Sequence, residues 1–105
     1  MNQTINYGLK FLNINQNGKE LTINHNMIII DFLHSRLIKS FIKNLPENPE
    51  NGDNFIIKDD KKSTNNHIAI FYEGWSFIKP TNFFTAFISN EPYQFKNNNW
   101  EKIEK

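Results

Sequence analysis

The sequence predicts an α+β fold in which an N-terminal arm and one long helix precede a small antiparallel sheet built as a meander of short hairpins. Three observations support it. The chain has 105 residues and no cysteine, which is enough for one small hydrophobic core. Apolar residues recur at helical spacing over 22–45. Over 53–103, short aromatic-rich segments alternate with turn residues. We therefore expect a single domain, 1–105, with residues 1–21 as arm and turn.

Composition excludes several classes of protein. Without cysteine the chain has no disulfide framework, no thiolate nucleophile and no cysteine zinc site. Twelve basic residues against eleven acidic ones leave a net charge of +1, so nucleic acid is not an expected partner. The longest apolar run, Met27–Ile30, ends at Asp31 and is too short to insert into a membrane. The start lacks the pattern of a signal peptide, so we expect synthesis in the cytoplasm.

The spacing of apolar residues differs between the arm, where they alternate, and the helix, where they recur at helical spacing. Alternating apolar residues over Ile5–Ile14 predict a short strand or an extended arm, and Asn15–Gly18 reads as a turn. Thr22 or Asn24 is expected to cap the helix, which Pro46 ends.

The predicted helix is apolar around more than half of its circumference. Beside its main stripe runs a second row, consisting of Ile28, Phe32, Ile38 and Ile42. A helix with so wide an apolar surface needs partners on two sides. The second row is therefore a candidate contact with another copy of the chain, and full burial within a monomer is the alternative.

The C-terminal half reads as hairpins. A strand is expected at Asp53–Lys58, and the wholly polar segment 59–66 predicts a mobile hairpin loop. Further short strands with intervening turns follow as far as Ile103. Segments 71–78 and 95–103 form a weak internal repeat, because in both an aromatic residue precedes a short polar turn and tryptophan follows it.

Motifs for catalysis, metal binding or cofactor binding are lacking in the sequence. His25 and His34 are nine residues apart, which places them on opposite sides of a helix. No serine lies in a Gly-x-Ser-x-Gly context, and no glycine-rich phosphate loop is present. Carboxylates are spread through predicted turns. We therefore expect a protein that is not an enzyme and holds neither metal nor cofactor.

The aromatic residues carry the open functional question. The candidates for contact with a glycan or a partner are Tyr72, Trp75, Phe77, Tyr93 and Trp100. Large aromatic side chains in a small domain usually pack in its core. A sugar-stacking platform is the alternative, and it would require at least two coplanar, exposed rings.

Short motifs in a fixed order resemble a domain of unknown function found in gene-transfer-agent and prophage tail-fibre proteins of alphaproteobacteria. The matching residues run from Gln16, Lys19, Thr22, Asn24 and Asp31, through Pro46, Pro49, Gly52, Asp53 and Phe55, to Ile68, Ala69, Phe71, Gly74, Trp75, Phe77, Pro80, Phe95 and Trp100. Within this pattern we expect five structural roles. Asn24 would cap the helix, Asp31 would bind a donor where helix meets sheet, and Gly52, Asp53 and Gly74 would form turns.

The resemblance implies a structural or host-recognition module of a phage-like tail, such as an adaptor or accessory protein of a fibre or baseplate, assembled into a particle. It implies partners among other tail proteins and a homo-oligomer, with a trimer favoured because tail fibres are commonly trimeric. Two alternatives are a small carbohydrate-binding module that stacks cell-surface glycans and a cytoplasmic protein-interaction domain.

Overall fold

A computed structural model of the chain describes residues 3–12 and 17–104, in which the chain divides into two compact units, Met1–Ser35 and Arg36–Lys105. The boundary lies ten residues before the expected end of the helix at residue 45. Ile14 of the expected arm, and Asn15 and Gln16 of the expected turn, lie outside the described residues.

The first unit begins with a tight reversal of the chain rather than a strand. Gln3 and Lys10 form an isolated antiparallel bridge, and the Thr4 N–H donates to the Leu9 carbonyl at 2.7 Å. The side chain of Asn26 then ties this segment to the helix. It accepts from the Lys10 N–H at 2.9 Å and donates to the Lys10 carbonyl at 2.8 Å. The alternating apolar pattern therefore did not produce a strand in the described part of the arm.

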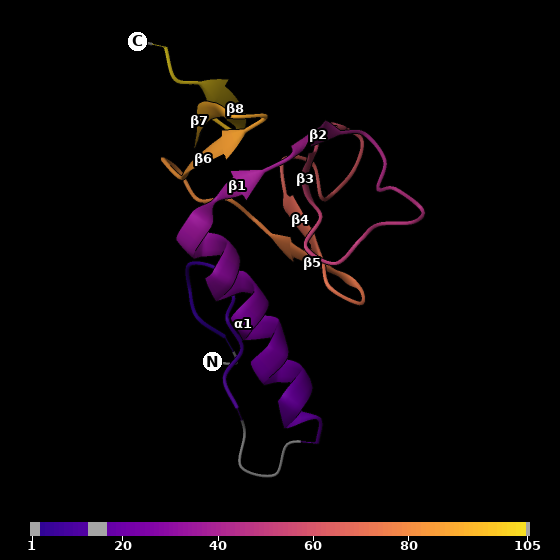
Figure 1. The fold of residues 1–105 in the computed structure, drawn as a ribbon. Coiled ribbons are helices and arrows are strands. Elements are labelled where there is room, and N and C mark those ends of the chain that lie inside the picture. Colours follow the sequence, from indigo (N-terminus) through magenta and orange to yellow (C-terminus); the bar gives the residue numbers. More distant parts are fainter. Residues whose placement is uncertain (1–2, 13–16, 105) are drawn as a thin grey trace. The chain divides into compact units, whose positions relative to one another are not determined.

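The single helix among the described residues, α1, spans Lys19–Ser35 (Figure 1). It starts earlier than expected, because Asn17 and Gly18 form the turn before it and the Gly18 carbonyl accepts from the Leu21 N–H at 3.0 Å. Thr22 and Asn24 therefore lie inside the helix, and the prediction that one of them caps it is wrong.

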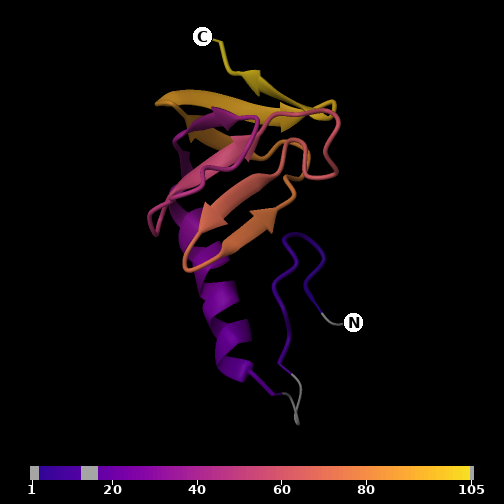
Figure 2. The same ribbon diagram turned by 90° about the vertical axis from the view of Figure 1, so that its right-hand side faces the viewer.

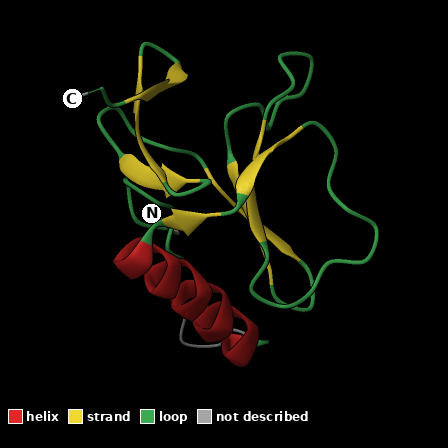
Figure 3. Ribbon diagram, turned by 45° about the horizontal axis from the view of Figure 1, so that its top comes forward, coloured by secondary structure: helices red, strands yellow, loops and turns green. Residues whose placement is uncertain are grey.

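The helix ends at Ser35, and the predicted extension to residue 45 is wrong. Arg36 adopts a left-handed conformation with φ 52°, a common way to terminate a helix. The chain continues as two short strands, β1 (Leu37–Ile38) and β2 (Ser40–Ile42), and Figure 3 shows the change from helix to strand. Pairing with distant strands supplies the backbone hydrogen bonds that a longer helix would have supplied.

The second unit contains two four-stranded mixed sheets. Their remaining strands are β3 (Asn54–Ile57), β4 (Ile68–Phe71), β5 (Trp75–Ile78), β6 (Thr85–Ile88), β7 (Glu91–Lys96) and β8 (Asn99–Lys102). The strand orders are β2-β3-β4-β5 in one sheet and β1-β6-β7-β8 in the other. The α+β class is confirmed, but the expected single antiparallel sheet is instead two sheets, each with one parallel pair.

The two sheets repeat one topology. In each, a strand from the segment 37–42 pairs in parallel with the first strand of a three-stranded antiparallel meander (Figure 2). The last hairpin of each meander pairs a phenylalanine with a tryptophan, Phe71 with Trp75 and Phe95 with Trp100. The internal repeat seen in the sequence therefore corresponds to equivalent hairpins.

The core of the second unit is mainly isoleucine. The largest side chains with less than 2% exposure there are Ile56, Ile68, Ile78 and Ile88. Phe41 of β2 contacts Tyr93 of β7 edge-on, with ring centroids 5.4 Å apart. The two sheets therefore pack against each other through the faces that carry Phe41 and Tyr93. No helix in the described part of the chain is both long and apolar enough to cross a membrane.

Candidate binding surfaces

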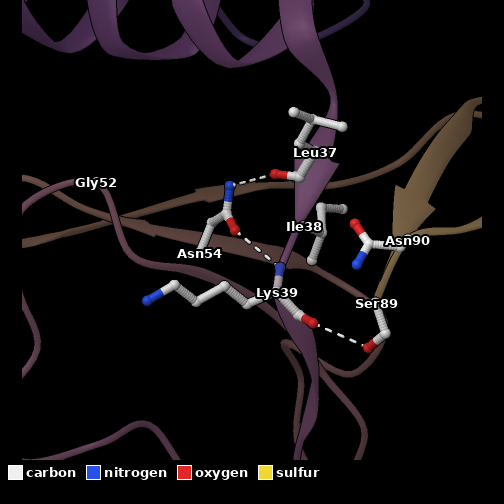
Figure 4. Close-up of a pocket in the computed structure, with 7 residues that line it drawn as sticks. All are labelled: Leu37, Ile38, Lys39, Gly52, Asn54, Ser89 and Asn90. Atoms are coloured by element: carbon white, nitrogen blue, oxygen red, sulfur yellow. Dashed lines mark hydrogen bonds between the residues drawn. The ribbon is translucent and has the colours of Figure 1, made fainter.

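A pocket of about 460 Å³ lies where the chain passes from β1 to β2 (Figure 4). It is lined by Leu37, Ile38, Lys39, Gly52, Asn54, Ser89 and Asn90. The Asn54 amide donates to the Leu37 carbonyl at 2.6 Å and accepts from the Lys39 N–H at 3.1 Å. The Ser89 hydroxyl donates to the Lys39 carbonyl at 2.9 Å. These hydrogen bonds fix the segment that connects β1 of one sheet to β2 of the other, so we assign the pocket a structural role.

An ion pair lies beside the segment that connects β1 to β2. The Lys39 ammonium bonds the Asp53 carboxylate, whose other oxygen accepts from the Glu50 N–H at 2.9 Å. These two hydrogen bonds lower the pKa of Asp53, and the bond to Asp53 raises the pKa of Lys39. The turn expected at Gly52 and Asp53 before a strand is confirmed, and Gly52 has φ 95°. The side-chain bond of Asp53 runs back to Glu50.

The β3-β4-β5 meander carries an aromatic face, formed by Phe55, Phe71, Trp75 and Phe77 around the buried Ala69. The Trp75 ring lies 5.1 Å from Phe71 and 6.4 Å from Phe55, measured between centroids. The planes are inclined by 62° and 50°, so the half-exposed indole is coplanar with neither of these two rings.

The five aromatic candidates do not form one platform. Tyr72, Trp75 and Phe77 belong to the β4-β5 hairpin, with Tyr72 exposed in its turn. Tyr93 and Trp100 lie in the other sheet, where Trp100 is only 6% exposed and donates its indole N–H to the Asn66 carbonyl at 3.0 Å. Trp100 is therefore a core residue, and its prediction as a contact residue is wrong.

The other sheet carries an apolar row that the sequence reasoning missed. The row consists of Leu37, Phe87, Pro92 and Ile103, and we call it the Phe87 row. Leu37 pairs with Phe87 and Phe87 with Pro92, while the Ile103 N–H donates to the Pro92 carbonyl. Phe87 is 49% exposed and Leu37 59% exposed. A hollow of about 590 Å³ adjoins the row, lined also by Glu91, Lys102 and Glu104.

A signal for this row was present in the sequence. Phe87 alternates with Ala86 and Ile88, and both of these neighbours are buried. In a strand, successive side chains point to opposite faces, so a phenylalanine between two core residues must lie on the outer face.

The predicted oligomer face on the helix does not exist as one surface. Ile38 is buried in β1 and Ile42 belongs to β2, while Phe32 on α1 is only 4% exposed. Ile28 is half-buried. The exposed apolar stripe of α1 is instead Ile23, Met27 and Ile30.

One further expected role is wrong. The Asp31 side chain is exposed and forms no hydrogen bond or ion pair with any described residue. Gly74 lies in the turn between β4 and β5, as expected, but the left-handed residue of that turn is Glu73, with φ 56°. Asn51 holds Glu73 in place by accepting from its N–H at 2.9 Å and donating to its carboxylate at 3.0 Å.

The titratable groups form no cluster suited to a metal ion. Within residues 3–12 and 17–104, no three side chains of histidine, aspartate or glutamate gather as possible ligands. Burial lowers the pKa of His25, and the charge of Lys10 lowers it further. The pKa of His67 is lowered in the same way by burial and by Lys79.

No protein-family model matches this chain, and no curated protein sequence does.

Proposed function

We propose that this chain is a non-enzymatic assembly module of a phage-like tail, and that it docks onto neighbouring tail proteins, including other copies of itself. The Phe87 row is the observation that carries the proposal. Its Leu37, Phe87 and Ile103 side chains are between 40% and 59% exposed on one sheet face. Contiguous exposed apolar side chains on a sheet are typical of surfaces that a partner covers.

The charges around the row suit a protein partner. Glu91 and Lys102 pair across the hairpin at 3.6 Å, and Glu104 lies beside the hollow. The apolar row thus has a rim with charges of both signs, the usual arrangement of a protein–protein interface. The ordered motifs from Gln16 to Trp100 that resemble tail-fibre domains support the choice of a tail as the assembly.

The test is whether the chain is part of a particle. Cells that encode the chain would express it with an epitope tag, and particles would be separated on a density gradient. We expect the tagged chain to band with the particles and Phe87→Ser to remain at the top of the gradient. A wild-type chain found only at the top would contradict the proposal.

The matched control is Phe83→Ser, which removes an exposed phenylalanine (68% exposed) that lies outside the row. Sedimentation of the purified chain then separates two kinds of partner. Self-association that Phe87→Ser abolishes would mean that copies of the chain cover the row. A monomer that nevertheless bands with particles would assign the row to another tail protein.

Glycan recognition is the alternative to this proposal. Of the two tryptophans only Trp75 is partly exposed, so a stacked sugar would have to change its fluorescence. A glycan titration that changes the emission of the wild type, but not that of Trp75→Phe, would favour the alternative.

A further inference from the structure

A third cavity, of about 270 Å³, lies within the Arg36–Lys105 unit between the loop after β3, the segment after β5 and the β7-β8 turn. Its lining residues are Ser63, Asn65, Asn66, His67, Lys79, Pro80, Phe95 and Asn98. Asn66, Pro80 and Phe95 are buried, and the other five are half-buried or exposed. The cavity is thus a polar recess with a partly apolar lining.

The frame of this recess is fixed by the buried Asn66. Its N–H donates to the Ile57 carbonyl at 2.7 Å and its carbonyl accepts from the Trp100 indole at 3.0 Å. Its amide donates to the Asn98 carbonyl at 2.9 Å and accepts from the Lys58 ammonium at 3.1 Å. Every polar group of Asn66 is therefore engaged, which holds the β3-β4 loop against the β7-β8 turn.

Side-chain donors around the recess lack partners. The His67 imidazole, the Lys79 ammonium, the Ser63 hydroxyl and the Asn98 amide form no hydrogen bond or ion pair with any residue that the structure describes. The Asn65 amide oxygen accepts from the Asp59 N–H at 2.9 Å, which leaves its NH₂ group available. None of the eight lining residues is acidic.

The backbone of His67 is anchored even though its ring is not. The His67 N–H donates to the Thr64 carbonyl at 2.9 Å, and the His67 carbonyl accepts from the Ile57 N–H at 3.1 Å. Lys79 follows the buried Ile78, and Pro80 after it is also buried. The two basic side chains thus line one recess with no counter-ion among the described residues. Burial disfavours a charge on the imidazole, and repulsion from Lys79 disfavours it further. An anion between them would remove this cost.

We propose that this recess binds the oxyanion of a small ligand, either a phosphate or a sugar carboxylate. Lys79 supplies the charge, and His67, Ser63, Asn65 and Asn98 supply neutral hydrogen-bond donors. The volume is below the range of roughly 300–1,000 Å³ typical of pockets for drug-sized ligands, so the ligand is no larger than about one acidic sugar. The inference does not depend on the proposed role in a tail.

Calorimetric titration of the whole chain tests it, with inorganic phosphate, glucuronate and, as a neutral control, glucose. We expect saturable binding of at least one anion and none of glucose. Lys79→Gln should weaken that binding about tenfold, since a hydrogen bond to a charged group is lost. Lys61→Gln is the matched control, because Lys61 is exposed in the loop between β3 and β4 but does not line the recess.

The readout at His67 keeps the test specific to the site. Binding should shift the proton resonances of the His67 ring in the wild type. The His67→Gln variant should bind more weakly, and its amide spectrum should still be that of a folded chain. Preference for phosphate would assign a phosphorylated ligand, and preference for glucuronate an acidic sugar. No saturable binding of either anion, or an equal loss in Lys61→Gln and Lys79→Gln, would overturn the proposal.

Discussion

The two sheets of the second unit have the same topology but protect their tryptophans differently. Each sheet ends in a hairpin that pairs a phenylalanine with a tryptophan. Trp100 is 6% exposed and its indole N–H is hydrogen-bonded, whereas Trp75 is half-buried and its indole N–H forms no hydrogen bond with any described residue. Equivalent positions in a repeated topology thus have different environments.

The connection between the first two strands of each meander explains the difference. In one sheet, residues 58–67 join β3 to β4 and reach the other sheet through Asn66. In the other, Ser89 and Asn90 alone join β6 to β7, both with positive φ, as in a tight hairpin. A two-residue turn cannot cover a distant side chain. Trp75 therefore remains partly exposed because the β6-β7 turn is too short to cover it.

Alanine substitution of the two tryptophans should give the largest contrast. Trp100→Ala empties a buried site and leaves the Asn66 carbonyl without its donor, at an expected cost of about 3–5 kcal/mol in unfolding free energy. Trp75→Ala should cost about 1–2 kcal/mol, since less apolar area is lost from a half-exposed site. Urea unfolding measures both. Equal losses would show that the two hairpins are equivalent after all.

Substitution of Asn66 tests whether the β3-β4 loop stabilises the sheet that contains Trp100. Asn66→Ala removes two side-chain hydrogen bonds at a residue with φ 69°, so we expect a loss of about 2–3 kcal/mol in unfolding free energy. Asn97→Ala is the matched control, because Asn97 has φ 55° but is exposed, and it should cost only about 1 kcal/mol. Trp100 fluorescence should respond in the Asn66 variant alone.

Alanine substitution of Gly52, before β3, and of Gly74, between β4 and β5, should change the free energy of unfolding with opposite signs. Gly52→Ala places a side chain at φ 95°, with an expected loss of about 1 kcal/mol or more in unfolding free energy. Gly74 has open space around it and no positive φ, so Gly74→Ala should stabilise the chain by about 0.4–1 kcal/mol. Thermal unfolding of both variants measures this. Destabilisation by Gly74→Ala would mean that Gly74 shapes the turn after all.

Acidification should produce the smallest effect. The pKa of His67 is lower in the folded chain than its ordinary value of 6.5, so the unfolded chain binds more protons between these two values. Folded stability should therefore fall as the pH is lowered through 6.5, and it should be unaffected well above that value. His25, in the other unit, acts in the same direction.

Unfolding curves at about pH 7.5 and about pH 5.5 would measure this slope. His67→Gln and His25→Gln should each flatten it, and His34→Gln, at an exposed position of α1, is the control. A slope that neither variant changes would assign the pH dependence to other groups.

The positions of the hairpins could be predicted from the sequence because their signals are local. The strands expected near 53–58 and after residue 67 are present to within one or two residues, and the repeat of Phe71 and Trp75 by Phe95 and Trp100 marks equivalent hairpins. The polar segment 59–66 does connect two antiparallel strands, as expected. Its mobility stays a prediction.

The segment 37–42 shows why the remainder could not be predicted. Ile38 and Ile42 lie four residues apart and fit a helical stripe, yet both are β-branched and also fit strands. The left-handed Arg36 and the pairing with β6 and β3 decide between the two, and both depend on contacts with residues about 15 to 50 positions away. The expected oligomer face was lost with this error, because half of its residues are in strands.

The α+β class, most of the turns and the paired aromatic hairpins could be predicted from the sequence, since these depend on neighbouring residues and on short periods. The presence of two sheets, and the burial of Trp100 but not of Trp75, follow from tertiary contacts alone. Each of these is set by which distant segment lies over a side chain, and local periodicity carries no record of that choice.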